Sequence, residues 1–295
     1  MDQRTATFQQ ARRRVHGIAY RMLGSAAEAE DVVQEAWLRW NESDTAQLEN
    51  PQGWLVTVTT RLAIDRLRVL RGERERYTGF WLPEPLVEPV DEDTPESLLE
   101  RADDVSFALL RVLEQLGPVE RAAFVLRQAF DMEYAELATL LGRSQAACRQ
   151  LVHRATERVQ AAAPRRSVDP AEHRRVLEAF AAAAGRGDLA ALRDLMAEDA
   201  ELVSDGGGKV NAFGQVLRGA QRLAQLYYAV MRRFGTRARY QLVQVDGRPG
   251  LARFVDGELE SVQAFEVRDG RIAAIYAQRN PDKLRLAGRR LSQTG

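Results

Sequence analysis

A proline-rich acidic segment constrains the fold of this chain most, because it interrupts two stretches that otherwise read as helical. Residues 73–104 hold four prolines, and eleven acidic residues against three basic ones. Proline cannot continue a helix or a central strand, and uncompensated negative charge opposes burial in a core. The segment therefore predicts an extended linker. Its centre is an exception, because the adjacent aromatic residues Phe80 and Trp81 are unusual in a bare linker.

The linker separates parts of different character. Residues 1–72 read as helical throughout, and residues 105–163 return to short helices. Residues 168–295 combine helices with a run of strands, which is typical of an α+β domain. We therefore expect two all-α domains joined by the linker of residues 73–104, followed by a C-terminal α+β domain.

Within the C-terminal part, we expect two helices near residues 170–185 and 188–197 to lead directly into a loop containing Gly206, Gly207 and Gly208. Three consecutive glycines supply positive φ angles and let another segment approach the backbone closely. A further helix is expected near 219–234, and alternating hydrophobicity predicts strands near 238–246, 251–256, 260–268 and 271–279.

Overall charge and cysteine content exclude several classes of protein. Lys and Arg total 42, and Asp and Glu also total 42, so no net charge indicates a partner. The single cysteine, Cys148, excludes an internal disulfide and a cysteine-rich zinc site. The N-terminus lacks an apolar core of signal-peptide length, and no run approaches the 18 or so apolar residues of a membrane span. We expect a reduced, cytoplasmic protein without membrane contact.

The first helical part carries a row of acidic and polar side chains. Ser25 and Glu28 have the spacing of a capping box, so a helix should begin there. Its buried stripe consists of Val33, Ala36, Trp37 and Trp40, and a second face at the same spacing holds Asp31, Gln34, Glu35 and Leu38. Taken alone, this second face is better explained as an acidic face exposed to solvent.

A second helix should begin at Asn50 and Pro51, an N-cap followed by proline in the first turn. One of its faces carries Trp54, Thr57, Arg61, Ile64 and Arg68. Aromatic, hydroxyl and guanidinium groups together can stack a base and hold phosphates. The alternative is that Trp54 belongs to the core and the arginines only face solvent.

Residues 142–166 predict a basic helix-turn-helix, with six arginines and one acidic residue. Gly142 permits the turn and Ser144 can cap the second helix, on whose buried face Cys148 is a small core residue. Arg and Gln on the exposed face suit readout of guanine and adenine edges in the major groove. The candidate DNA contacts are Arg143, Ser144, Arg149, Gln150, His153 and Arg154. A merely solvated arginine-rich helix is the alternative.

Together these residues resemble the extracytoplasmic-function (ECF) sigma factors of bacteria. The stretch Ala29–Leu38 and the helix after Asn50 resemble domain σ2, and the stretch from Leu116 through the helix-turn-helix resembles domain σ4. Three further motifs are similar to those of the group with a fused SnoaL-like (NTF2-like) domain, ECF group 41. They are Trp81-Leu82-Pro83-Glu84-Pro85, Asp205-Gly206-Gly207-Gly208-Lys209 and Asn280-Pro281-Asp282-Lys283-Leu284.

The resemblance implies a transcription initiation factor that binds core RNA polymerase, through its β′ clamp and β flap, and promoter DNA. Polymerase binding is implied for Asp31, Gln34, Glu35 and Leu38, contact with the −10 element for Trp54, Thr57, Arg61 and Arg68, and −35 readout for the exposed face of the helix-turn-helix. It also implies regulation in cis by the C-terminal domain, in place of a separate anti-sigma factor. The sequence alternative is a ligand-responsive helix-turn-helix regulator, or a DNA-binding enzyme with an NTF2-like pocket.

An NTF2-like cone often encloses a pocket, for which apolar lining is available at Phe213, Leu226, Tyr227, Val230 and Phe234. Core packing would use the same residues, and a small ligand remains an open alternative. We expect no enzyme activity, metal or cofactor, because no paired-carboxylate or His/Asp spacing appears and the glycine loop lacks P-loop spacing.

The three motifs carry the expected regulatory contacts. They contain apolar, glycine and charged groups that would be costly or exposed if left alone. We expect Asp205–Lys209 and Asn280–Leu284 to lie on one side of the C-terminal domain, near Trp81 or the σ2 surface.

Overall fold

The computed structural model describes residues 3–44, 48–90, 106–162 and 169–292. The chain forms two compact units, Met1–Arg76 with Leu109–Ala163, and Tyr77–Ala108 with Pro164–Gly295. The first unit is helical and the second is α+β, which confirms the predicted fold class. The predicted boundaries at 104–105 and 163–168 lie outside the described residues. From Tyr77 onward, the linker belongs to the C-terminal unit.

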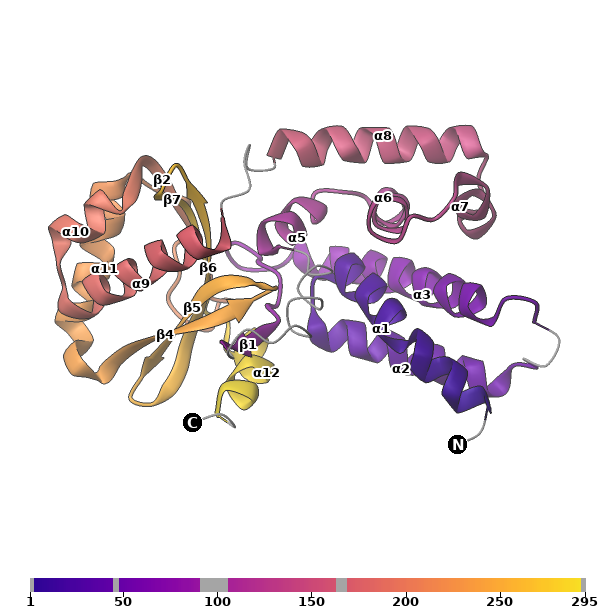
Figure 1. The fold of residues 1–295 in the computed structure, drawn as a ribbon, viewed down its shortest axis with the longest axis horizontal. Helices are drawn as coiled ribbons and strands as arrows, with labels where there is room; N and C mark the ends of the chain where they lie inside the picture. The colour runs from indigo at the N-terminus through magenta and orange to yellow at the C-terminus, as the bar shows by residue number, and fades with distance from the viewer. Residues whose placement is uncertain (1–2, 45–47, 91–105, 163–168, 293–295) are drawn as a thin grey trace. The chain divides into compact units, whose positions relative to one another are not determined.

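The N-terminal unit is built from helices throughout (Figure 1). In chain order they are α1 (Gln3–Leu23), α2 (Ala26–Glu42), α3 (Pro51–Arg74), α5 (Phe107–Leu113), α6 (Pro118–Phe130), α7 (Tyr134–Leu141) and α8 (Gln145–Ala162). The first two residues of α5 belong to the second unit. Within the described residues, no helix is both long enough and apolar enough to cross a membrane.

The predicted helix starts of α2, α3 and α8 are confirmed by their caps. The side chains of Ser25, Asn50 and Ser144 accept hydrogen bonds from the backbone N–H groups three residues later, at 3.3, 2.9 and 3.1 Å. Such bonds satisfy donors that have no partner inside the helix. The carboxylate of Glu28, the other residue of the predicted capping box, accepts a hydrogen bond from Arg66 Nη2 at 2.7 Å.

A buried charge cluster joins α1 and α3 to α5 and α6. Arg121, only 1% exposed, donates from Nη1 to the Met22 carbonyl at 2.6 Å and to Glu114 at 2.9 Å. Arg74 donates to the Leu23 carbonyl at 2.9 Å and also pairs with Glu114. Two guanidinium groups thus meet the carbonyl end of α1, where cations are favoured, and share one carboxylate.

The C-terminal unit contains a seven-stranded sheet in the order β1-β4-β5-β6-β7-β2-β3. Its strands are β1 (Val87–Pro89), β2 (Met196–Asp205), β3 (Leu217–Arg218), β4 (Ala238–Val245), β5 (Arg248–Val255), β6 (Glu258–Arg268) and β7 (Arg271–Gln278). β2 and β7 pair in parallel and the other pairs are antiparallel. Three Asp-Gly pairs, at 246–247, 256–257 and 269–270, form the hairpin turns, with positive φ at both residues of each.

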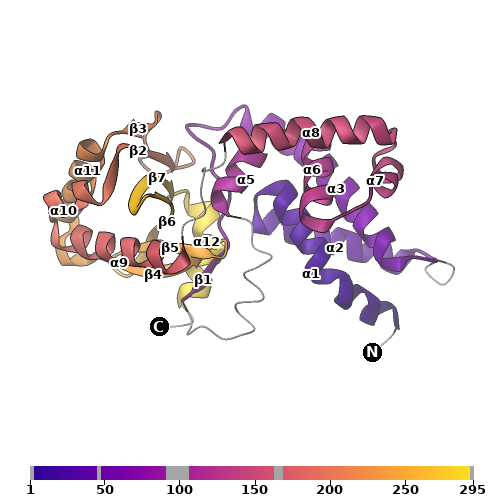
Figure 2. The same cartoon turned by 45° about the horizontal axis from the view of Figure 1, so that its top comes forward.

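Each face of this sheet is covered by different segments. The helices α9 (Pro170–Arg186), α10 (Leu189–Asp194) and α11 (Ala220–Phe234) pack on one face, and the 3-10 helix η1 (Gly235–Arg237) follows α11 (Figure 1). The other face carries α12 (Pro281–Ser292) and the linker (Figure 2). From the linker, Leu82 and Val87 enter the hydrophobic core on this face. The linker is therefore a structural part of the C-terminal unit.

The expected second helix of this unit, near 188–197, is wrong in its length. α10 ends at Asp194, and β2 fills Met196–Asp205 before the glycine loop begins. The first half of β2 is rich in Ala and Glu, which favour helix over strand, and its register against β7 shifts between Met196 and Glu201. Pairing with β7, a contact distant in sequence, overrides the local preference.

Candidate polymerase and DNA interfaces, linker cluster and cavity

The outward face of α8 is composed as the sequence predicts. Its polar residues Arg149, Gln150, His153 and Arg154 are exposed, as are Arg143 and Ser144 before it. Cys148, Val152 and Ala155 are buried on the opposite face. The Arg149 guanidinium lies 5.1 Å from the centre of the Tyr134 ring on α7, and His153 lies 3.5 Å from Glu157. Arg154 and Gln150 remain open to an incoming base edge or phosphate.

The predicted −10 face of α3 is divided. Arg61 and Arg68 are exposed, and Arg68 donates to Asp65 at 2.7 Å. Trp54 is half-buried, with its ring 5.5 Å from that of Trp40, and the Thr57 hydroxyl donates to the Gly53 carbonyl at 2.9 Å. Ile64, aligned with this row in the sequence, is buried. Trp54 thus belongs partly to the core, as the alternative interpretation of this row supposed. The outward part of the row is formed by Arg61 and Arg68.

The second face of α2 presents an apolar side chain among acidic and polar ones. Asp31 and Gln34 are exposed, and Leu38 is 49% exposed. Glu35 pairs with Arg39 at 2.9 Å, one helical turn away. This face therefore presents one apolar side chain, Leu38, among acidic and polar ones.

The three sequence motifs meet around the buried carboxylate of Asp205, which is 0% exposed. Its Oδ1 accepts hydrogen bonds from the Tyr77 hydroxyl at 2.6 Å and the Gly207 N–H at 2.9 Å. Its Oδ2 accepts from the Leu82 N–H at 2.9 Å and from Lys283 Nζ at 2.7 Å. A buried anion is thereby paired with one cation and bonded at both oxygens. We call Tyr77, Trp81, Leu82, Asp205, Gln278, Asn280 and Lys283 the linker cluster.

Lys283 links α12 to the linker by three kinds of contact. Its ammonium donates to Asp205 and to the Leu82 carbonyl, at 2.7 Å in each case. It also lies 4.0 Å from the centre of the Trp81 ring and 4.8 Å from that of Tyr77. Cations are attracted to aromatic faces at such distances. One lysine side chain therefore contacts Asp205 and two aromatic residues of the linker.

The glycine loop allows Asn280 to approach closely. Gly207 has a φ of 62°, and a Cβ added there would lie 2.4 Å from the Asn280 side chain. Asn280 donates to the Tyr77 hydroxyl at 2.8 Å and accepts from the Asp282 N–H at 3.1 Å, which caps the start of α12. The Lys209 ammonium forms an ion pair with the Asp282 carboxylate and donates a hydrogen bond to it. This hydrogen bond is the largest of the effects that lower the pKa of Asp282.

Sequence reasoning missed Tyr77 and Gln278. Gln278 Nε2 donates to the carbonyl groups of Leu82 and Pro83, at 3.3 and 3.0 Å, and to Asp205 at 3.3 Å. Burial and the hydrogen bond to Asp205 raise the pKa of the Tyr77 hydroxyl, which stays a neutral donor. A tyrosine four residues before Trp81 and a glutamine two residues before Asn280 were the available signals, but neither residue type alone indicates a contact.

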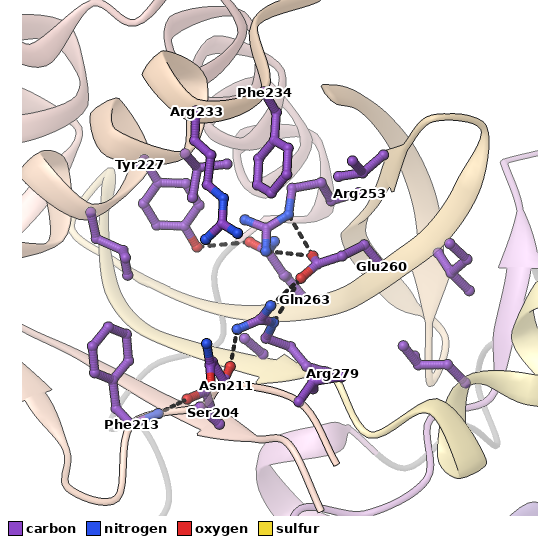
Figure 3. A pocket seen from close by; sticks show the side chains of 18 of the residues that line it. Ser204, Asn211, Phe213, Tyr227, Arg233, Phe234, Arg253, Glu260, Gln263 and Arg279 are labelled. Atoms are coloured by element: carbon purple, nitrogen blue, oxygen red, sulfur yellow. Dashed lines mark hydrogen bonds and ion pairs between the residues drawn. The ribbon is translucent and has the colours of Figure 1, made fainter. Parts of the chain in front are cut away.

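The C-terminal unit also holds a cavity of about 800 Å³ (Figure 3). Its apolar lining includes the five residues expected from the sequence: Phe213, Leu226, Tyr227, Val230 and Phe234. Its polar wall carries Arg253, Glu260, Gln263 and Arg279, which the sequence did not single out. Within the described part of the chain, no group of His, Cys, Asp and Glu side chains could hold a metal ion.

Glu260 lies between two arginines in this wall. Arg253 Nε donates to one carboxylate oxygen at 2.7 Å, and Arg279 Nε donates to the other at 2.8 Å. Burial acts to raise the Glu260 pKa, but the two guanidinium groups outweigh it and hold the pKa below its usual value. A carboxylate held in this way is a poor proton acceptor.

Comparison with known proteins finds relatives whose similarity extends over both units of this chain. Residues 7–72 match the family model of Sigma-70 region 2, and residues 106–159 match that of Sigma-70, region 4. The chain is 38% identical to the ECF RNA polymerase sigma factor SigJ of Mycobacterium tuberculosis, across 98% of this chain and 96% of that protein. It is 34% identical to the probable ECF sigma factor SigI of the same species, over 90% of each.

A solved structure extends the similarity to the whole fold. The crystal structure of M. tuberculosis SigJ superposes with a TM-score of 0.77 and 36% identity, covering 95% of this chain and 98% of that one. Sequence similarity and fold therefore agree over almost the full length. The chain belongs to the ECF RNA polymerase sigma factors.

Proposed function

We propose that this sigma factor binds core RNA polymerase through the second face of α2, contacts the −10 element through α3 and reads the −35 element through α8. A sigma factor works with core polymerase and promoter DNA, and each of these partners would bind a different surface of the helical unit. The observation that carries it is the outward face of α8, where Arg and Gln side chains are exposed opposite a buried apolar face. These residue types pair with guanine and adenine edges.

For the polymerase contact, we propose the β′ clamp as the partner of Asp31, Gln34, Glu35 and Leu38, and the β flap as a further contact of the helix-turn-helix unit. The exposed Leu38 beside carboxylates supports a protein partner rather than DNA, because phosphates would be repelled there.

For regulation, we propose that the C-terminal unit acts in cis by holding the linker, so that no separate anti-sigma factor is required. Support comes from the linker cluster, in which Asp205 and Lys283 bind residues that connect the two sigma domains in the sequence. We assign no catalytic step to this unit, since the pKa of Glu260, a carboxyl group in the polar wall of the cavity, is lowered. The site of action is the cytoplasm, where bacterial transcription occurs.

The proposal is tested by charge reversal on α2. A variant carrying Asp31→Lys and Glu35→Lys should lose binding to purified core enzyme and promoter-dependent transcription in vitro. Both side chains reach solvent, so the fold should be preserved. Glu42→Lys, an exposed position at the end of the same helix, is the matched control and should bind normally. Unchanged core binding by the double variant would remove this face from the polymerase contact.

A further inference from the structure

We propose that the cavity of the C-terminal unit binds a small amphipathic carboxylate, whose anionic head is held by Arg233 and Arg253 and whose apolar body lies against α11. The cavity measures about 800 Å³, which lies within the range of roughly 300–1,000 Å³ usual for small-molecule sites. It is lined by side chains from α11, β2, β5, β6, β7 and the start of α12. The ligand therefore contacts most elements of this unit.

The apolar wall fixes the character of the ligand's body. Leu226, Val230 and Phe234 follow one another at helical spacing on α11 and all line the cavity. Phe213, from the loop after β2, also lines the cavity and lies across the space from Phe234 (Figure 3). Aromatic and branched aliphatic side chains of this kind gain free energy by removing apolar surface from water. The body is a ring system or a branched hydrocarbon.

In the polar wall, the side-chain oxygens of Glu260 and Gln263 already accept hydrogen bonds from other residues of the protein. Both oxygens of Glu260 are occupied by Arg253 and Arg279, and the Gln263 oxygen accepts from the Tyr227 hydroxyl at 2.8 Å. A ligand that offered only N–H or O–H groups would find these acceptors taken.

Donors, by contrast, remain available. Ser204, 3% exposed, accepts from the Phe213 N–H at 3.0 Å, which leaves its hydroxyl hydrogen free to donate to a ligand in the cavity. Within the described residues, the Arg233 guanidinium makes no hydrogen bond or ion pair, and it points into the cavity from α11 (Figure 3). The ligand must therefore bring acceptor oxygens.

The charge of the lining sets the charge of the head. Arg233, Arg253 and Arg279 line the cavity together with Glu258, Glu260 and Asp256. Asp256 is already neutralised by Arg237, which lies outside the lining and donates to it at 2.6 Å. One positive charge is left over, so the lining fits a monoanion, and a guanidinium fork matches the two oxygens of a carboxylate.

The cavity borders the linker cluster at two places. Ser204 lines the cavity and the next residue, Asp205, binds the linker. Pro281 and Leu284 line it as well, and Lys283 between them holds the Leu82 carbonyl. A ligand would therefore touch the same turns that hold the linker. This regulatory consequence rests on the proposed function, whereas the binding itself does not.

The test is isothermal titration calorimetry on the full chain, with two acids and their neutral amides of the same shape. The acids are 2-naphthoate and cyclohexanecarboxylate, and the amides are 2-naphthamide and cyclohexanecarboxamide. We expect each acid to bind at least about tenfold more tightly than its amide, because only the acid gains charge-assisted hydrogen bonds. Arg233→Gln should remove that difference and leave amide binding unchanged. Arg232→Gln, an exposed neighbour outside the lining, is the control and should retain the difference.

A second pair of variants tests the location. Val230→Trp should fill the cavity and abolish binding of the acids, while Gln225→Trp, at an exposed position of the same helix outside the lining, should not. Equal affinity for acid and amide, a normal acid preference in Arg233→Gln, or no heat from either acid at about 10 mM would each overturn the proposal. None of these measurements involves polymerase, so their failure leaves the sigma-factor function untouched.

Discussion

Asp205 shows how one buried charge can organise three distant stretches of sequence. Its two oxygens receive hydrogen bonds from the linker, from the glycine loop, from the end of β7 and from Lys283. A carboxylate can accept at several positions, whereas the isosteric amide has one acceptor oxygen and adds two donors. The charge is therefore as important as the shape at this position.

Asp205→Asn should cost about 3 kcal/mol in the free energy of unfolding of the C-terminal unit, because it leaves the partly buried Lys283 without its anion. Urea unfolding followed by circular dichroism measures the change. Asp282→Asn is the control: its pair with Lys209 is exposed on both sides, and its loss should cost under about 1 kcal/mol. Similar costs for the two variants would contradict the central role of Asp205.

The only histidine of the C-terminal unit predicts a pH dependence. Burial, with a smaller effect of Arg248, lowers the pKa of His173 from 6.5 to about 4. The folded unit keeps a neutral imidazole, while the unfolded chain takes up a proton below pH 6.5. Its contribution to stability is thus complete above pH 6.5 and falls by about 3 kcal/mol as the pH drops to 4. Denaturant midpoints between pH 7 and 4 should fall less in His173→Leu than in wild type. An equal fall in both would contradict the assignment.

At the scale of elements, the sequence predicted what local rules determine. The starts of α2, α3 and α8 follow from Ser25, Asn50 and Ser144, each of which caps its helix through its own side chain. A cap and an apolar period lie within one helix, so they can be recognised without knowing the rest of the fold.

Elements that depend on distant partners were predicted less well. β1 has three residues, one of them proline, and exists only because Val87–Pro89 pairs with Val243–Val245 of β4. β2 was missed because its partner β7 lies some seventy residues later. In the candidate sites, the sequence was enough to identify residues whose chemistry is evident from their type and spacing. It did not identify Tyr77, Gln278 and Glu260, because their roles depend on neighbours that only the folded chain brings close.

The outward face of α8 predicts distinct effects for its two arginines. Replacing a base-reading arginine by alanine should cost about 1–3 kcal/mol and relax the preference at one position of the −35 element. A phosphate contact would weaken binding to all sequences alike and lower its salt dependence. Fluorescence anisotropy on a set of −35 variants distinguishes these outcomes for Arg149→Ala and Arg154→Ala. Arg158→Ala, whose side chain pairs with Glu120, is the control. Unaltered binding by both variants on every sequence would exclude the face from readout.

At the scale of the whole molecule, the linker belongs to the unit that follows it. Leu82 is 1% exposed and packs in one core with residues of the sheet and α12, so its burial requires the C-terminal unit. Segments of the same composition would be open to solvent in a chain of two sigma domains alone.

A chain truncated after Ala162 should therefore be cleaved by thermolysin within residues 77–89, at the apolar side chains around Leu82 and Val87. The full chain should resist cleavage there, because β1 is paired and Leu82 is buried. Mass spectrometry of the fragments over time gives the sites and their rates. Equal cleavage rates in the two chains would show that the C-terminal unit does not protect the linker.

The pairing of β1 with β4 has a further consequence for any state in which the linker leaves. β1 is the outermost strand on its side of the sheet, so its departure uncovers the backbone N–H and C=O groups of Val243–Val245 at the end of β4. An uncovered edge is a template for strands of other molecules, including a second copy of the same chain. Released protein would then self-associate by strand addition, and the share of free sigma factor would fall as its concentration rises.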